Sequence, residues 1–132
     1  MIVGVADTHT AIWYLSGSPR LSQNAKGFLD TAANNGDEIG LSSISFVEMV
    51  YLIEKGRIPA ESLSRLAAEL SSIGLFTEVP VDLQVARALS RVDITQVPDM
   101  PDRIIAATAG HLNVPIISRD SKIQLSSINT IW

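Results

Sequence analysis

The stretch IVGVADTHTAIW at residues 2–13 decides the fold class. Residues 2–6 form a short, continuous apolar run, which is typical of a strand buried on both faces of a parallel sheet. The run ends at Asp7, and residues 8–16 have a helical pattern. A buried strand that passes directly into a helix predicts the first half of a βα unit.

The same alternation continues along the chain. We predict further strands at 39–41, 76–79, 114–117 and 130–132, and further helices at 21–34, 42–54, 60–73, 81–91 and 102–111, with a helical turn near 121. The apolar stripe of helix 60–73 consists of Leu63, Leu66, Ala67, Leu70 and Ile73, and residues 92–101 predict a loop. The pattern predicts an α/β fold: a central parallel sheet of four to five short strands flanked by helices.

Length and composition limit the class of protein. The chain has 132 residues, of which 46% are apolar and 18% charged, so we expect a single domain over residues 1–132 and neither disorder nor several domains. Because there is no cysteine, disulfides, thiol nucleophiles and thiolate metal sites are excluded. No apolar run is long enough to span a membrane and no secretory signal is visible, so we expect a cytoplasmic protein with no membrane partner.

Four acidic residues fall at or near junctions between predicted strands and helices. Asp7 closes the first strand, Glu48 lies early in helix 42–54, Asp102 opens helix 102–111, and Asp120 follows strand 114–117. Ligands of parallel sheets bind beyond the carboxyl ends of the strands. Acids that meet there repel one another unless a cation is present, and Mg²⁺ or Mn²⁺ prefers such oxygen ligands.

Each of these acids also has a purely structural interpretation. Asp7 is a candidate N-cap, Glu48 a capping-box partner of Ser45, and Asp102 and Asp120 first-turn acids stabilised by the helix dipole. Spacing alone leaves both interpretations open.

Taken in order, the motifs resemble those of the PIN-domain ribonucleases, in particular the VapC-type toxins of type II toxin–antitoxin systems. The resemblance covers nearly the whole chain and rests on Asp7-Thr-His-Thr-Ala-Ile-Trp13, Glu48, Asp99-Met-Pro-Asp102-Arg103 and Ser118-Arg-Asp120. It implies a PIN-like domain with the activity of a Mg²⁺- or Mn²⁺-dependent endoribonuclease. It also implies an RNA substrate, an inhibitory antitoxin protein, and assembly as a homodimer or as a toxin–antitoxin hetero-oligomer.

The resemblance assigns residues to roles. Asp7, Glu48, Asp102 and Asp120 are the expected catalytic residues and metal ligands, with Asp99 as a fifth ligand, and Thr8 and Ser118 as supporting hydroxyls. The family usually has proline directly after the first aspartate of the loop motif, whereas Met100 intervenes here. This departure allows Asp99 to point elsewhere. Arg103 either pairs with a carboxylate or holds an RNA phosphate with its bidentate fork.

The alternative function is a non-catalytic receiver-like domain that senses phosphate or binds a protein. Against it, no apolar strand precedes Asp99. His9 has no partner at metal-ligand spacing, so we interpret it as a packing or surface residue. Trp13, Tyr14 and Tyr51 either stack bases, line an antitoxin groove or pack in the core.

The net charge of −4 at first disfavours nucleic acid as a partner. If the five acids of the predicted metal site are set aside, nine acids remain against ten bases. The remaining surface is therefore close to neutral, which predicts modest nonspecific affinity for RNA.

Overall fold

The computed structural model describes all of residues 1–132 and contains five strands and seven helices. The strands are β1 (Ile2–Ala6), β2 (Glu38–Ser42), β3 (Phe76–Val79), β4 (Ile116–Ile117) and β5 (Thr130–Ile131). The helices are α1 (Thr8–Ser16), α2 (Gln23–Asn34), α3 (Ile44–Glu54), α4 (Ser62–Ser71), α5 (Leu83–Leu89), α6 (Met100–Leu112) and α7 (Ser121–Gln124). No helix is both long enough and apolar enough to cross a membrane.

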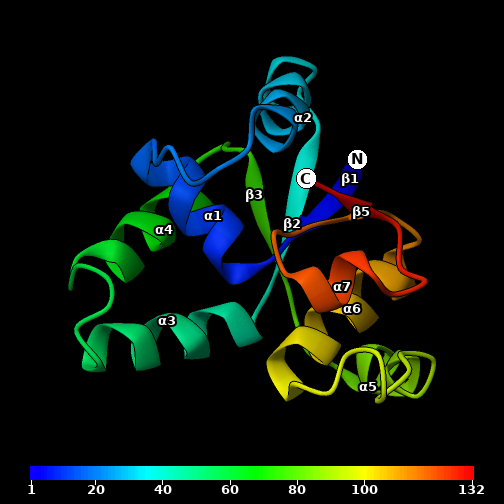
Figure 1. Cartoon of the computed structure of the whole chain (residues 1–132). Coiled ribbons are helices and arrows are strands. Elements are labelled where there is room, and N and C mark those ends of the chain that lie inside the picture. The colour runs from blue at the N-terminus through cyan, green and yellow to red at the C-terminus, as the bar shows by residue number, and fades with distance from the viewer.

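All five strands are parallel and lie in the order β3-β2-β1-β4-β5. This confirms the predicted α/β fold with a central parallel sheet. Figure 1 shows α1 and α4 on one side of the strands and α6 and α7 on the other. Successive strand residues point to opposite faces: Val5 joins the core beneath α5 and α6, whereas Ala6 joins the core beneath α1 and α2.

The chain order of the strands reverses at β1. The chain runs outward from β1 through β2 to β3, and then returns to the other side of β1 with β4 and β5. Ligands of open parallel sheets bind at such a reversal, beyond the carboxyl ends of the strands. Asp7 directly follows β1, and the segment from Ser118 to Asp120 directly follows β4.

Two predicted boundaries are wrong in an informative way. Helix α6 begins at Met100 rather than at Asp102, because Asp99 caps it and Pro101 fits its first turn, where a missing N–H costs nothing. Helix α4 ends at Ser71, so the predicted stripe residue Ile73 lies outside it and is fully exposed. The first correction places Asp102 inside the first turn of α6.

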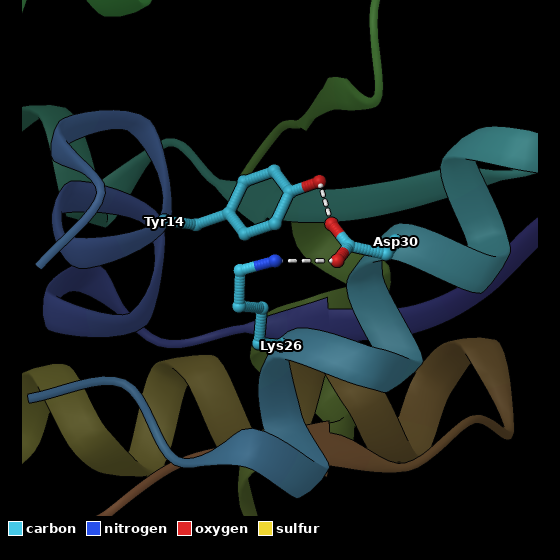
Figure 2. Close-up of polar contacts among 3 residues, drawn as sticks. All are labelled: Tyr14, Lys26 and Asp30. Carbon is cyan, nitrogen blue, oxygen red and sulfur yellow. Dashed lines mark hydrogen bonds and ion pairs between the residues drawn. The ribbon is translucent and has the colours of Figure 1, made fainter. Parts of the chain in front are cut away.

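A small polar cluster fastens α1 to α2 (Figure 2). Asp30 of α2 accepts a hydrogen bond from the hydroxyl of Tyr14 in α1 at 2.7 Å and pairs with Lys26 at 2.7 Å. Burial and the neighbouring Asp30 raise the pKa of Tyr14 to about 12, while Lys26 and then Tyr14 lower the pKa of Asp30. Tyr14 is therefore a structural residue, and it fixes the helix that begins at Asp7.

Candidate active site

The five predicted acids line one cleft at the carboxyl edge of the sheet. Asp7 comes from the end of β1, Glu48 from α3, Asp99 and Asp102 from the start of α6, and Asp120 from the start of α7. The cleft has a volume of about 450 Å³ and is also lined by His9, Trp13 and Arg119. Asp99 therefore belongs to the cleft despite the inserted Met100.

A buried hydroxyl cluster supports Glu48 from below. The hydroxyl of Thr8 donates to Oε1 of Glu48 at 2.5 Å and shares a hydrogen bond of 2.9 Å with the hydroxyl of Ser45. Thr8 and Ser45 are both buried, whereas Glu48 is half-buried. The capping-box interpretation of Glu48 is therefore wrong: its carboxylate bonds to the side chain that follows Asp7 across the sheet edge.

A second buried hydroxyl ties the acids of β1 and α7 together. The hydroxyl of Ser118 donates to Oδ2 of Asp7 at 2.5 Å and accepts a hydrogen bond of 3.0 Å from the backbone N–H of Asp120. The hydroxyl of Thr10 donates to the carbonyl of Ile117 at 2.9 Å and fixes the same junction from the α1 side. Thr8 and Ser118 thus hold the positions expected of supporting hydroxyls.

Three of the acids are helix caps as well as cleft residues. Asp7 accepts from the backbone N–H of Thr10 at 2.9 Å, Asp99 from that of Asp102 at 3.2 Å, and Asp120 from those of Lys122 and Ile123. An acid of this set can therefore cap a helix and line the cleft at the same time. An N-cap at the carboxyl edge of a parallel sheet faces the ligand-binding edge because the helix starts there.

Negative charge on the buried carboxylates of the cleft is unfavourable. Burial raises the pKa of Asp102 to about 7, and the nearby carboxylates, Asp99 foremost, add to the effect. Burial also raises the pKa of Glu48, although the hydrogen bond from Thr8 opposes this. The cleft thus resists full ionisation, which is the behaviour expected where carboxylates share one site without a cation.

The donor set suits a hard divalent cation bound partly through water. No group of three or more Asp, Glu or His side chains is arranged to hold a metal ion by itself. Mg²⁺ typically takes only one or two carboxylates and completes its shell with water and substrate phosphate, so this arrangement fits such an ion. All-oxygen ligands exclude a structural zinc centre of the usual histidine and thiolate kind.

The prediction for Arg103 is wrong. Its guanidinium donates to the carbonyls of Leu89, the last residue of α5, and of Val92 at 3.1 and 3.2 Å, and it forms no ion pair. Arg103 fastens α5 to α6, the helix that carries Asp102.

His9, Trp13 and Arg119 also line the cleft. The sequence assigned His9 a packing or surface role and left base stacking open for Trp13, whereas it assigned no role to Arg119. His9 and Trp13 stand four residues apart on the helix that follows Asp7, and Arg119 is the residue directly before Asp120.

Residues 5–127 match the PIN domain family. Ribonuclease VapC22 of Mycobacterium tuberculosis is 27% identical over 129 residues, which cover 94% of this chain and 92% of that protein. The crystal structure of VapBC2 from Rickettsia felis, bound to a DNA fragment from the promoter, contains a similar chain with a TM-score of 0.71 and 17% identity, covering 98% of this chain and 97% of that one. A toxin–antitoxin complex from Klebsiella pneumoniae contains another, with a TM-score of 0.66, 21% identity and coverage of 98% and 96%.

Proposed function

The chain belongs to the PIN domain family, and from this premise we propose that its acidic cleft is the active site of a metal-dependent endoribonuclease. One observation carries the proposal. Acids from four separate segments, centred on Asp7, Glu48, Asp102 and Asp120, line a single cleft at the sheet edge where ligands of this architecture bind. The similarity to Ribonuclease VapC22 supports RNA as the substrate.

Asp7, Asp102 and Asp120 would hold Mg²⁺ or Mn²⁺, partly through bound water, with Asp99 beside them. When bound, such a cation would offset the clustered charge, polarise a phosphoryl oxygen and activate water for phosphodiester hydrolysis. Among the cleft acids, the ionised form of Asp102 would gain most from such a cation, because no protein hydrogen bond stabilises it.

The remaining roles follow from the contacts of the chain's own side chains. Ser118 and the N–H of Thr10 each bind one oxygen of Asp7, which fixes the orientation of this carboxylate toward the cleft. Thr8 holds Oε1 of Glu48, and the raised pKa makes Glu48 suited to orient water or accept its proton. Attack of water with departure of the 3′ oxygen leaves a 5′-phosphate and a 3′-hydroxyl.

The test is cleavage of single-stranded RNA by the purified protein with Mg²⁺ or Mn²⁺. We expect cleavage that EDTA stops, that Asp7→Asn abolishes, and that Asp37→Asn, a matched change outside the cleft, leaves intact. Cleavage in EDTA, or full activity of Asp7→Asn, would refute the metal mechanism. Because the substrate would be cellular RNA, the proposed place of action is the cytoplasm.

We also propose that the chain is the toxin of a toxin–antitoxin pair, because similar chains occur in VapBC2 of Rickettsia felis and in a toxin–antitoxin complex of Klebsiella pneumoniae. The hollow between α1, α3 and α4 is apolar at its base, with Ile12, Leu15 and Leu66, and carries Glu61 and Arg65. This chemistry suits an amphipathic antitoxin segment. The product of the adjacent gene should stop RNA cleavage, and Leu15→Glu should escape this inhibition while it still cleaves RNA.

Self-association remains a prediction for α3. Its residues Val47, Val50 and Tyr51 are 62%, 43% and 53% exposed and form an apolar face at helical spacing. A homodimer through this face should become a monomer on Val47→Glu, as measured by light scattering. A monomeric wild-type chain would refute it.

A further inference from the structure

Arg119 lies in the acidic cleft but pairs with none of its acids. It is the only Lys or Arg among the lining residues, and five carboxylates line the same space. The single ion pair of the chain joins Lys26 to Asp30, neither of which lines the cleft. A cation in such surroundings ordinarily pairs with a carboxylate, so its position needs another explanation.

The explanation is an aromatic side chain. The guanidinium carbon of Arg119 lies 5.7 Å from the ring centroid of Trp13, which is the geometry of a cation–π contact. A cation–π contact uses the charge of the guanidinium and leaves its N–H donors available to a ligand. Arg119 is exposed, so these donors are accessible.

His9 lies beside Trp13 and lines the same cleft. Its ring centroid lies 5.5 Å from that of Trp13, with an interplanar angle of 46°, and His9 is exposed. Trp13 is half-buried, packs against the core and contacts Trp132 at 6.0 Å, so it is rigidly held. We call His9, Trp13 and Arg119 the aromatic shelf.

We propose that the aromatic shelf binds the nucleotide next to the scissile phosphate of a single-stranded RNA. Arg119 takes the phosphate through its planar fork, and the base stacks on the exposed ring of His9, which Trp13 supports from the side. This inference rests on the proposed nuclease function and adds the part of the site that recognises its substrate.

An RNA substrate needs the aromatic shelf because the acids alone would repel it. The acids repel RNA phosphates, so the polymer needs a cationic side chain in the cleft, and Arg119 is the only Lys or Arg that lines it. Stacking then selects single strands, because only an unpaired base exposes its ring faces. The cleft volume of about 450 Å³ falls within the range of small-ligand pockets, roughly 300–1,000 Å³.

Steady-state cleavage of a single-stranded RNA with Mg²⁺ or Mn²⁺ tests the shelf. Arg119→Gln should raise KM roughly ten- to hundredfold with kcat much less affected, as expected for one lost charge-assisted contact. For Arg119→Gln, the slope of log affinity against log salt concentration should be shallower by about 0.7, which is the contribution of one phosphate contact in a single strand. His9→Ala should raise KM by at least about fivefold without changing this salt dependence. Arg20→Gln, an exposed arginine beyond the other end of α1, is the matched control and should do neither.

A binding measurement is independent of catalysis. Trp132→Phe leaves Trp13 as the only tryptophan of the chain. In a Trp132→Phe, Asp102→Asn protein with EDTA at low salt, a single-stranded RNA octanucleotide should quench tryptophan emission. The corresponding duplex should not, and Arg119→Gln should remove the effect.

The outcomes separate the two proposals. RNA cleavage by the wild type with unchanged KM and salt dependence in Arg119→Gln and His9→Ala would overturn the shelf and leave the nuclease intact. Arg119-dependent quenching by RNA in a chain that cleaves no RNA would support the shelf and overturn the nuclease. Neither cleavage nor quenching would overturn both.

Discussion

Replacing Asp102 by Asn should stabilise the metal-free protein at neutral pH while it removes activity. Burial and four neighbouring carboxylates raise the pKa of Asp102 from 3.8 to about 7. A shift of this size corresponds nominally to about 4 kcal/mol. Because the side chain is only half-buried, solvent screening reduces this to about 1–2 kcal/mol. Loss of a first-turn acid from α6 costs about 0.5 kcal/mol, so the net gain in unfolding free energy is about 1 kcal/mol.

The sign of the pH dependence follows from proton binding. Between pH 3.8 and about 7 the folded chain keeps a proton on Asp102 that the unfolded chain releases. The wild type therefore loses stability as pH rises through this window, and Asp102→Asn does not. The advantage of the variant should be small near pH 4 and reach its full value above pH 7.

Thermal unfolding in EDTA at several pH values measures this difference. A gain of 1 kcal/mol in a chain of this size raises Tm by about 3–5 °C. Asp37→Asn, an acid outside the cleft, is the matched control and should show no such pH-dependent gain. The reasoning is refuted if Asp102→Asn melts below the wild type at pH 8, or if the difference between them does not change with pH.

Three further outcomes are expected. Thr8→Val removes the hydrogen bond that lowers the pKa of Glu48, so the acidic limb of the pH–rate profile should move to higher pH; an unmoved profile would show that Glu48 need not ionise. Ser118→Ala removes the hydroxyl that binds Oδ2 of Asp7 and the N–H of Asp120 and should lower the unfolding free energy by about 1–3 kcal/mol, measured by urea denaturation; a neutral effect would contradict the bridging role. Mg²⁺ or Mn²⁺ at about 100 times its dissociation constant should stabilise the wild type by about 2.7 kcal/mol, and the gain should vanish in Asp7→Asn, Asp102→Asn; equal stabilisation of both would place the ion elsewhere.

The fold is predictable from the sequence because the strand pattern and the helix pattern are both local. Apolar runs identify the strands, and the change to helical spacing after Asp7 identifies the parallel βα arrangement. The boundary at α6 was missed because Pro101 looks like a loop residue, although proline also fits the first turn of a helix. Ile73 continues a helical pattern beyond the point where the helix ends, which periodicity cannot detect.

The site was predictable where it depends on strand order and unpredictable where it depends on side-chain direction. Asp7, Glu48 and Asp120 follow strands that topology must align, so their convergence could be expected. Arg103 and Arg119 each stand beside a site aspartate in the sequence, but only Arg119 reaches the cleft. The guanidinium of Arg103 instead donates to the backbone carbonyls of Leu89 and Val92, a tertiary contact that no local sequence pattern predicts.

The double use of the acids explains how so crowded a set of carboxylates is tolerated. Asp7, Asp99 and Asp120 each accept backbone N–H groups at helix starts, and these hydrogen bonds hold their carboxylates in place. Asp102 and Glu48 are not caps, and they are the two cleft acids whose pKa is raised. Capping thus fixes three of the acids in position, while burial and repulsion from neighbouring carboxylates raise the pKa of the two uncapped members. A divalent cation or a proton is needed to relieve that repulsion, and the cleft is consequently prepared to exchange one for the other near neutral pH.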